Sequence, residues 1–319
     1  AAATADGKER ALRARRAQGL TLQLNDLDEP VTCMLDVGAH VLLGCSNGHI
    51  AVYHKKTRRP VEIRRTSAPS VSSLTFVRRA MTIWGTSKDN KIYVWSVRTG
   101  KMVRVLDDHE GRVTALLPVN KYVWSTSTDV TFRVWNAKTY KLLKTVSVQK
   151  FMISIHAHGP HVWIGTESAI MRWDKHTCKP VDLLKRHRKM VHAFVSVGEH
   201  RVWSASADRT ICVWDTDSGE CVRQIDAHGS RVTSLLYSAA TNHVYSCSHD
   251  KSIKVWHATT FECLRSIDMA HDDAVTALML VDAGGDAAAA PAPPPPVELW
   301  STSLDSRIGV WSVDARYTA

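Results

Sequence analysis

One short pattern recurs seven times along this 319-residue chain, and no other feature restricts the possible folds as strongly. Each copy closes on an aromatic residue, and successive closing residues are 42, 40, 38, 41, 42 and 55 positions apart. Six positions before each aromatic stands an acidic or amide residue. Because loop lengths drift between copies while this offset stays fixed, the offset indicates a local structure that every copy shares. The pairs are Asn47 with Tyr53, Asp89 with Trp95, Asp129 with Trp135, Glu167 with Trp173, Asp208 with Trp214, Asp250 with Trp256, and Asp305 with Trp311.

Each copy is predicted to form four strands. An apolar segment such as "VTAL" at 113 or "VHAF" at 191 opens it, and an alternating segment such as "RVWSASAD" (201–208) follows. After the acidic turn come a third strand, as in "TICVW" (210–214), and a fourth, as in "ECVRQID" (220–226). Both faces of these strands carry apolar residues, so one small sheet cannot bury its own surfaces. Seven sheets that stack radially and close into a ring can do so.

The repeat length, the spacing of His, Asp and Trp, and the "VWD" ending resemble the WD40-repeat family over roughly residues 19–315. This resemblance implies an all-β fold, a seven-bladed β-propeller. It also implies that in each complete blade a His, a Ser, the turn Asp and the Trp form a buried hydrogen-bonded set. The complete sets would be His109, Ser125, Asp129 and Trp135; His187, Ser204, Asp208 and Trp214; His228, Ser246, Asp250 and Trp256; and His271, Ser301, Asp305 and Trp311.

Blades one, two and four depart from this pattern, and we expect packing to hold them instead. Removing one member of a complete set is expected to cost about 1–3 kcal/mol, because its partner stays buried and unsatisfied. The departures are Tyr53 for Trp, Gly85 for Ser, Glu167 for Asp, and Leu27, Ser67 and Val148 for His.

The seventh copy lacks a fourth strand after Trp311, and the N-terminal segment "GLTLQLND" (19–26) offers one. Leu24 precedes Val31 by seven positions, as Ile225 precedes Val232 in a complete copy. We therefore predict that residues 20–24 form the outer strand of the last blade, which would leave the ring without an open edge.

Two segments fall outside the repeat. Residues 1–18 are a basic lead-in, flexible or helical, and residues 19–319 make up a single propeller. Within it, 282–296 is a low-complexity Ala/Pro loop inserted in blade seven, which we interpret as a solvent loop. The P-x-x-P match from Pro291 to Pro294 leaves an SH3-type ligand as the alternative. The chain has no initiator Met, which is consistent with a piece of a longer protein.

Composition limits the cellular setting. No run of eighteen apolar residues occurs, so no membrane span is expected. The first residues show no signal-peptide pattern. The seven cysteines include no C-x-x-C pair. These features favour a reduced intracellular compartment, with the cytoplasm as the first expectation and the nucleus as the alternative.

No catalytic or cofactor site is expected. The four Ser/His/Asp groups occur in register in successive copies, and neither a G-x-S-x-G elbow nor a Gly-rich phosphate loop occurs. His156 and His158 share one face of a strand, but no Cys or carboxylate lies at ligand spacing, so no metal is expected.

Two surfaces are predicted to bind partners. One end of the propeller, the top face, carries the loops before each first strand and the turns before each acidic residue. We expect its partner-binding residues to be Lys88, Arg112, Phe151, Met190, Arg231 and His249, because Arg, Met and aromatic side chains often anchor protein interfaces.

The opposite end, the bottom face, is predicted to be basic. Residues 51–101 hold twelve Lys or Arg and two Asp or Glu. The net charge of this segment therefore equals the formal charge of +10 on the whole chain. We call the predicted patch on blades one to three the bottom patch. Its residues are Lys55, Lys56, Arg58, Arg59, Arg78, Arg79, Arg98, Lys101, Lys121, Lys138 and Lys141.

The sequence thus predicts a non-catalytic scaffold or recruitment module that binds one or more proteins through its faces, as part of a multiprotein assembly. The alternative is an anionic-ligand binder, for RNA, an acidic protein tail or a phosphoinositide surface, through the bottom patch. Trp recurs at the second strand of five copies. In this respect the sequence is similar to propellers attached to signalling proteins such as inositol-polyphosphate phosphatases and Rho exchange factors. The five residues are Trp84, Trp124, Trp163, Trp203 and Trp300.

Overall fold

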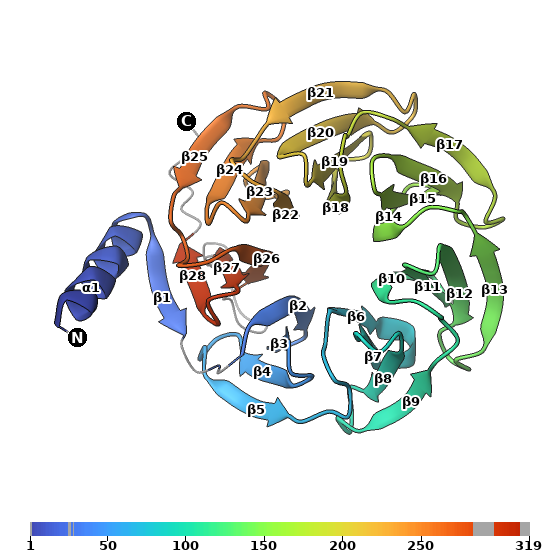
Figure 1. Cartoon of the computed structure of the whole chain (residues 1–319), viewed down its shortest axis with the longest axis horizontal. Helices are drawn as coiled ribbons and strands as arrows, with labels where there is room; N and C mark the ends of the chain where they lie inside the picture. Colours follow the sequence, from blue (N-terminus) through green and yellow to red (C-terminus); the bar gives the residue numbers. More distant parts are fainter. Residues whose placement is uncertain (1, 25–26, 28, 283–296, 313–319) are drawn as a thin grey trace, which may run out of the picture.

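A computed structural model describes residues 2–24, 27, 29–282 and 297–312, with the side chains of 9–24, 27, 29–281 and 297–312. Seven antiparallel sheets of four strands each are arranged radially around one centre (Figure 1). This arrangement confirms the predicted all-β, seven-bladed propeller. The expected Ala/Pro loop at 282–296 lies outside the described residues from 283 onward, between β26 and β27 of blade seven.

In blades one to six the strands run from the centre outward in chain order, and in blade seven the outer strand comes from the start of the chain. Blade one contains β2 (Val31–Val37), β3 (His40–Cys45), β4 (Ile50–His54) and β5 (Pro60–Arg64); blade two contains β6 (Ser73–Val77), β7 (Thr82–Thr86), β8 (Ile92–Ser96) and β9 (Met102–Leu106). Blade three contains β10 (Val113–Val119), β11 (Tyr122–Ser127), β12 (Thr131–Asn136) and β13 (Leu142–Ser147); blade four contains β14 (Met152–His158), β15 (His161–Thr166), β16 (Ile170–Asp174) and β17 (Pro180–Leu184). Blade five contains β18 (Val191–Val197), β19 (Arg201–Ser206), β20 (Thr210–Asp215) and β21 (Cys221–Asp226); blade six contains β22 (Val232–Ser238), β23 (His243–Ser248), β24 (Ile253–His257) and β25 (Cys263–Ile267). Blade seven contains β26 (Val275–Asp282), β27 (Val297–Ser303) and β28 (Ile308–Ser312), with β1 (Leu20–Leu24) as its outer strand.

The hydrophobic core lies between the blades, in a separate cluster at each junction. Phe132 of blade three, for example, stacks on Trp124 and meets the edge of Trp173 from blade four, with ring centroids 5.0 and 4.9 Å apart. The middle strands of each blade are buried on both faces because a neighbouring blade covers each face. This packing explains why these strands carry apolar or small hydroxyl residues on both faces.

The N-terminal strand closes the ring, as predicted. β1 pairs antiparallel with β28, with Leu20 opposite Trp311 and Leu24 opposite Ile308. Leu20 is buried in the cluster between blades six and seven, and Leu24 in the cluster between blades seven and one. A strand from the start of the chain therefore completes the last blade and contributes to two core clusters.

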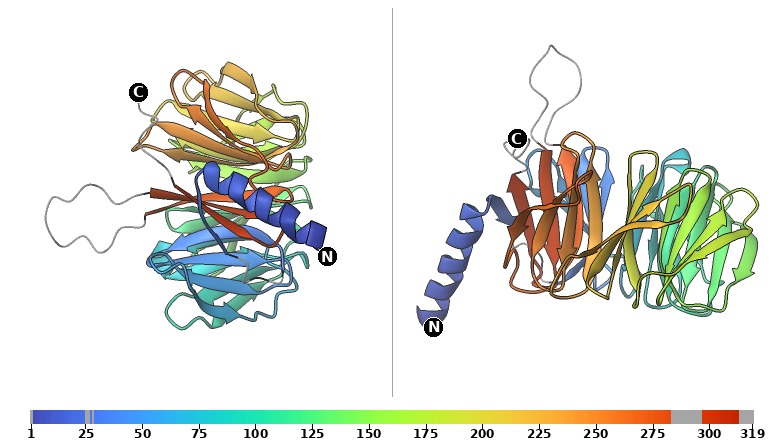
Figure 2. Two further views of the ribbon diagram at one scale, coloured as in Figure 1. Left: turned by 90° about the vertical axis from the view of Figure 1, so that its left-hand side faces the viewer. Right: turned by 90° about the horizontal axis from the view of Figure 1, so that it is seen from above.

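The basic lead-in forms a helix, α1 (Ala2–Ala17), whose C-terminal end adjoins the outer side of the ring and whose N-terminal end projects away from it (Figure 2). Arg15 attaches it: its Nε donates to the Met269 carbonyl at 2.9 Å, and its guanidinium pairs with Asp272. Leu12 packs against the same cluster as Leu20. Within the described residues, no helix is both long and apolar enough to cross a lipid bilayer.

Hydroxyl groups near the start of the inner strands bond adjacent blades together. Thr114 donates to the carbonyl of Met152 at 2.9 Å, and Thr233 to that of Val275 at 2.7 Å. Equivalent bonds occur at five of the seven junctions of the described ring. The remaining three donor–acceptor pairs are Thr32 with Val71, Ser154 with Val191, and Thr276 with Val31.

The other two junctions, between blades two and three and between blades five and six, differ. Ser72 and His192 occupy the corresponding positions, and neither donates to a carbonyl of the next blade within the described residues. Ser72 instead accepts a hydrogen bond from Arg112 at 3.3 Å.

Candidate binding site at the top of the central channel

In four blades the His, Ser, Asp and Trp side chains form the hydrogen-bonded sets that the resemblance implied. In blade three, the His109 imidazole lies 2.7 Å from both Ser125 Oγ and Asp129 Oδ2, and the Trp135 indole donates to Ser125 at 2.8 Å. In the other three sets, His–Ser distances are 2.7–2.8 Å and His–Asp distances 3.0–3.1 Å. Their members are His187, Ser204, Asp208 and Trp214; His228, Ser246, Asp250 and Trp256; and His271, Ser301, Asp305 and Trp311.

These contacts keep the turn carboxylates ionised. Burial by itself raises the pKa of Asp208, but hydrogen bonds from His187, Thr210 and the Arg188 backbone outweigh burial and hold that pKa well below its usual range. The pKa of Asp250 is lowered in the same way. Burial lowers the pKa of His109, although Asp129 opposes the effect. In each of these blades the set therefore connects the loop before the first strand, the second strand and the turn on the top face.

Blade two differs from the expectation that packing alone holds it. Asp89 accepts a hydrogen bond from the Tyr93 hydroxyl at 2.7 Å, in place of the missing His. The Tyr93 ring stacks on Trp95, with an interplanar angle of 15°. Sequence reasoning overlooked this pair because Tyr93 comes from the third strand, whereas the missing His belongs to the loop before the first.

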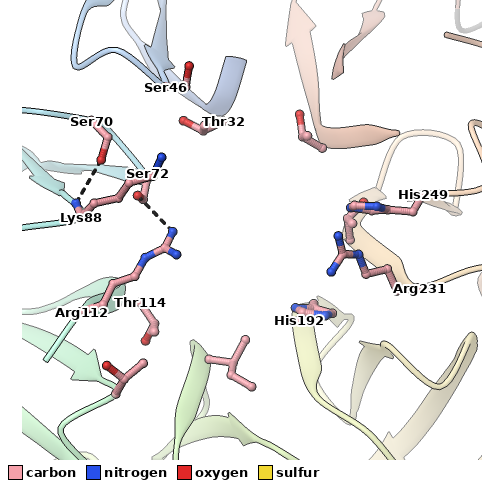
Figure 3. A pocket seen from close by; sticks show the side chains of 14 residues that line it. Thr32, Ser46, Ser70, Ser72, Lys88, Arg112, Thr114, His192, Arg231 and His249 are labelled. Atoms are coloured by element: carbon pink, nitrogen blue, oxygen red, sulfur yellow. Dashed lines mark hydrogen bonds between the residues drawn. The ribbon is translucent and has the colours of Figure 1, made fainter. Parts of the chain in front are cut away.

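A cavity of about 500 Å³ opens at the centre of the top face. Its lining includes the cations Lys88, Arg112 and Arg231 together with His192 and His249, and eight of the fourteen lining residues are Ser or Thr. Among these described lining residues, none is acidic. Arg112 enters from one side, and Arg231, His192 and His249 from the opposite side (Figure 3). The cavity therefore concentrates positive charge and hydrogen-bond donors.

The backbone fixes the positions of these cations. Arg112 and Arg231 each come directly before an inner strand, and their carbonyls accept hydrogen bonds from Thr128 N and His249 N at 2.9 and 3.1 Å. Lys88 N donates to Ser70 Oγ at 3.0 Å (Figure 3). The loop before each of these strands is thus hydrogen-bonded to the turn beside it.

The two histidines of the cavity are neutral at physiological pH. Burial lowers the pKa of His192 to about 4, with a further contribution from Arg231 and His249. Burial and Arg231 also lower the pKa of His249. His192 was missed in the sequence analysis; its only signal is that "VHAF" carries His at a position where five of the other six copies carry Ser or Thr.

The structure brings together four of the six predicted top-face residues: Lys88, Arg112, Arg231 and His249. Phe151 and Met190 lie in top-face loops but do not line the cavity. They are 49% and 47% exposed and thus remain available as apolar contacts outside the cavity.

The bottom patch is less uniform than its sequence suggests. Lys55 forms an ion pair with Asp36, and Arg58 pairs with the buried Glu298 of blade seven. In the described part of the chain, the other nine cations are exposed and form no ion pair. All of them lie in loops between first and second or third and fourth strands, at the same end of blades one to three. They are Lys56, Arg59, Arg78, Arg79, Arg98, Lys101, Lys121, Lys138 and Lys141.

His156 and His158 are engaged by a neighbouring blade. The His156 and His158 rings lie 2.7 and 2.8 Å from Ser196 Oγ of blade five. No group of three or more His, Cys, Asp or Glu arranged to hold a metal ion occurs among the described residues.

The ring, its internal hydrogen-bonded sets and its loop-bearing faces define a closed seven-bladed propeller of repeated units. A family model described as "WD domain, G-beta repeat" matches residues 219–257. This match covers one repeat, from the end of blade five through the third strand of blade six, and the seven repeated blades form a propeller of the WD40 type. Propellers of this family are typically non-catalytic, and their fold generally supports protein-interaction scaffolds.

Two curated relatives are similar to parts of the chain. The WD repeat-containing protein srw1 of Schizosaccharomyces pombe is 27% identical over 190 residues, 54% of this chain and 33% of the relative. The probable serine/threonine-protein kinase pats1 of Dictyostelium discoideum is 40% identical over 55 residues, 17% of this chain and 2% of the relative. The matched parts thus cover at most one third of these relatives.

Proposed function

We propose that this propeller is a non-catalytic recruitment module whose central top-face cavity receives an acidic segment of a partner protein. The observation that carries the proposal is the convergence of Lys88, Arg112 and Arg231 on a cavity whose described lining holds no carboxylate. Clefts lined by charge of one sign attract the opposite charge and speed association. Arginine can also bind a carboxylate through two parallel hydrogen bonds.

The size and surroundings of the cavity support a peptide ligand. Its volume of about 500 Å³ falls within the range of ordinary ligand pockets. Hydroxyl groups on its wall can donate to carboxylate or backbone oxygens. Phe151 and Met190, exposed beyond the cavity, provide apolar contacts for the flanks of a bound segment.

Reversing the charge of two cavity cations is expected to weaken binding of an acidic peptide at least tenfold. The double variant Arg112→Glu with Arg231→Glu places carboxylates on both sides of the cavity, where they repel the ligand. Fluorescence anisotropy with a labelled Glu-rich nonapeptide measures the effect. The matched control, Arg98→Glu with Lys138→Glu, changes the net charge equally on the bottom face. Equal loss in both double variants, or none in the first, would contradict the proposed site.

A second candidate function is polyanion binding at the bottom patch, favoured by its nine exposed cations without an ion pair among the described residues. Binding of a 30-nucleotide poly(U) is expected at 50 mM salt. It should weaken by about 2.5 orders of magnitude at 200 mM if six phosphates of this single strand are contacted. The variant to compare is Lys56→Glu, Arg78→Glu, Arg79→Glu and Arg98→Glu, which leaves the paired Lys55 and Arg58 unchanged. Binding that survives these four changes would exclude the bottom patch.

A further inference from the structure

A groove of about 230 Å³ lies on the outer side of the ring, between blades one and two. Leu42, Ile50, Ile83 and Trp95 line it, and all four belong to the buried cluster between these two blades. Met102, which is 48% exposed, lies beside its opening. The groove is therefore an apolar recess that opens to solvent, separate from the cavity at the centre of the ring.

The groove lies beside Trp95 of blade two, and the hydrogen-bonded set of this blade is incomplete. Ser67 lines it and stands where the complete blades carry a buried His such as His109. Gly85 stands where the complete blades carry the Ser that accepts a hydrogen bond from the Trp indole. A Cβ at Gly85 would come within 2.7 Å of the Trp95 ring. The Trp95 ring thus approaches the backbone of the second strand, and the short Ser67 side chain leaves the space beside it unfilled.

Trp95 consequently keeps an unused donor. In the four complete blades the indole nitrogen donates to a Ser hydroxyl at 2.8 Å. The Trp95 indole nitrogen forms no hydrogen bond to any described residue, although the ring lines the groove. A ligand carbonyl or carboxylate can satisfy this N–H, and pairing an indole N–H with an acceptor is the usual arrangement for a buried Trp.

The rim of the groove is positively charged. Arg65 and Lys101 are exposed and form no ion pair among the described residues, whereas Arg64 pairs with Glu62 at 2.8 Å. No acidic residue is among the described residues that line the groove. An apolar recess with a cationic rim and a free N–H donor matches a particular ligand chemistry: an apolar side chain flanked by acidic residues.

We propose that this groove is a second peptide-binding site, which accepts a single large apolar side chain carried by an acidic segment of a partner protein. The side chain packs on Ile83 and Trp95, and a backbone or side-chain oxygen of the segment accepts from the Trp95 indole. Carboxylates on either side approach Arg65 and Lys101. The site is independent of the central cavity, so it does not rest on the function proposed above.

Anisotropy with a labelled Glu-Asp-Glu-Phe-Glu-Asp-Glu peptide tests the site, with the same peptide carrying Ala in place of Phe as the reference. We expect the Phe peptide to bind at least tenfold more tightly. Lys101→Glu should weaken its binding about tenfold. Lys141→Glu, at the equivalent position of blade three, should leave it unchanged. Ser67→Trp, a substitution at an exposed position, should fill the recess and abolish the preference for Phe over Ala.

Thermal unfolding of each variant verifies that the ring is intact before binding is compared. Equal binding of the Phe and Ala peptides by the unmodified chain would overturn the proposal. So would a Phe preference that persists in Ser67→Trp or disappears in Lys141→Glu as much as in Lys101→Glu. Loss of the Phe preference in the Arg112→Glu and Arg231→Glu double variant would also overturn it, since the peptide would then occupy the central cavity.

Discussion

A chain that begins at residue 27 is expected to lose the single cooperative unfolding transition of the intact ring. Without β1, β28 becomes an exposed edge strand. Leu20 and Leu24 are also removed from two core clusters, and burying each side chain stabilises the fold by about 1.5–3 kcal/mol. This loss is large beside a typical unfolding free energy of about 5–15 kcal/mol. Differential scanning calorimetry measures the transition.

The control for this deletion is a chain that begins at residue 18. It lacks α1 and the contacts of Arg15 with Met269 and Asp272 but keeps β1 in place. We expect it to unfold cooperatively at a slightly lower temperature. A synthetic peptide of residues 18–26 should restore the cooperative unfolding transition of the chain that begins at residue 27. An unchanged melting curve after removal of residues 1–26 would show that β1 does not close the ring.

Asp208→Ala is expected to lower the unfolding free energy of the ring by about 3 kcal/mol. The carboxylate accepts hydrogen bonds from His187, from the Arg188 backbone N–H, and from both the backbone and hydroxyl of Thr210. Removing it leaves several buried or half-buried donors without an acceptor, each at a cost of about 1–3 kcal/mol before relaxation. Urea denaturation measures the change. Asp226→Ala, at an exposed position of the same blade, is the control and should change stability by less than about 0.5 kcal/mol.

The same carboxylate should make stability depend on pH. Its pKa is lower in the folded chain than in the unfolded chain, so its contribution is fully present above about pH 4 and is lost as the pH falls toward the folded-state value. Asp208→Asn should flatten the acid limb of the stability curve below pH 4. An acid limb as steep as that of the unmodified chain would assign the effect to other carboxylates.

Much of the fold could be predicted from the sequence because its signals are local. The offset of six between Asp208 and Trp214 reflects one turn and one strand, and the spacing of Leu24 from Val31 repeats that of a complete blade. The Tyr93–Asp89 bond and the ion pair of Arg58 with Glu298 could not be predicted in this way. In the first, a Tyr from the third strand takes the place of the His that other blades supply from the loop before their first strand. The second joins residues far apart in the chain, which meet only because ring closure brings blade seven beside blade one.

The position of the central cations has a consequence for the mechanics of the ring. The two junctions without a hydroxyl-to-carbonyl bond divide the described propeller into two arcs, blades three to five and blades six through seven to two. Arg112 stands at one seam and Arg231 at the other, on opposite sides of the cavity (Figure 3). An anionic segment that reaches both guanidinium groups therefore contacts both arcs. Because it binds the closed ring in preference to an opened one, its binding stabilises the closed ring by an amount that grows with ligand concentration.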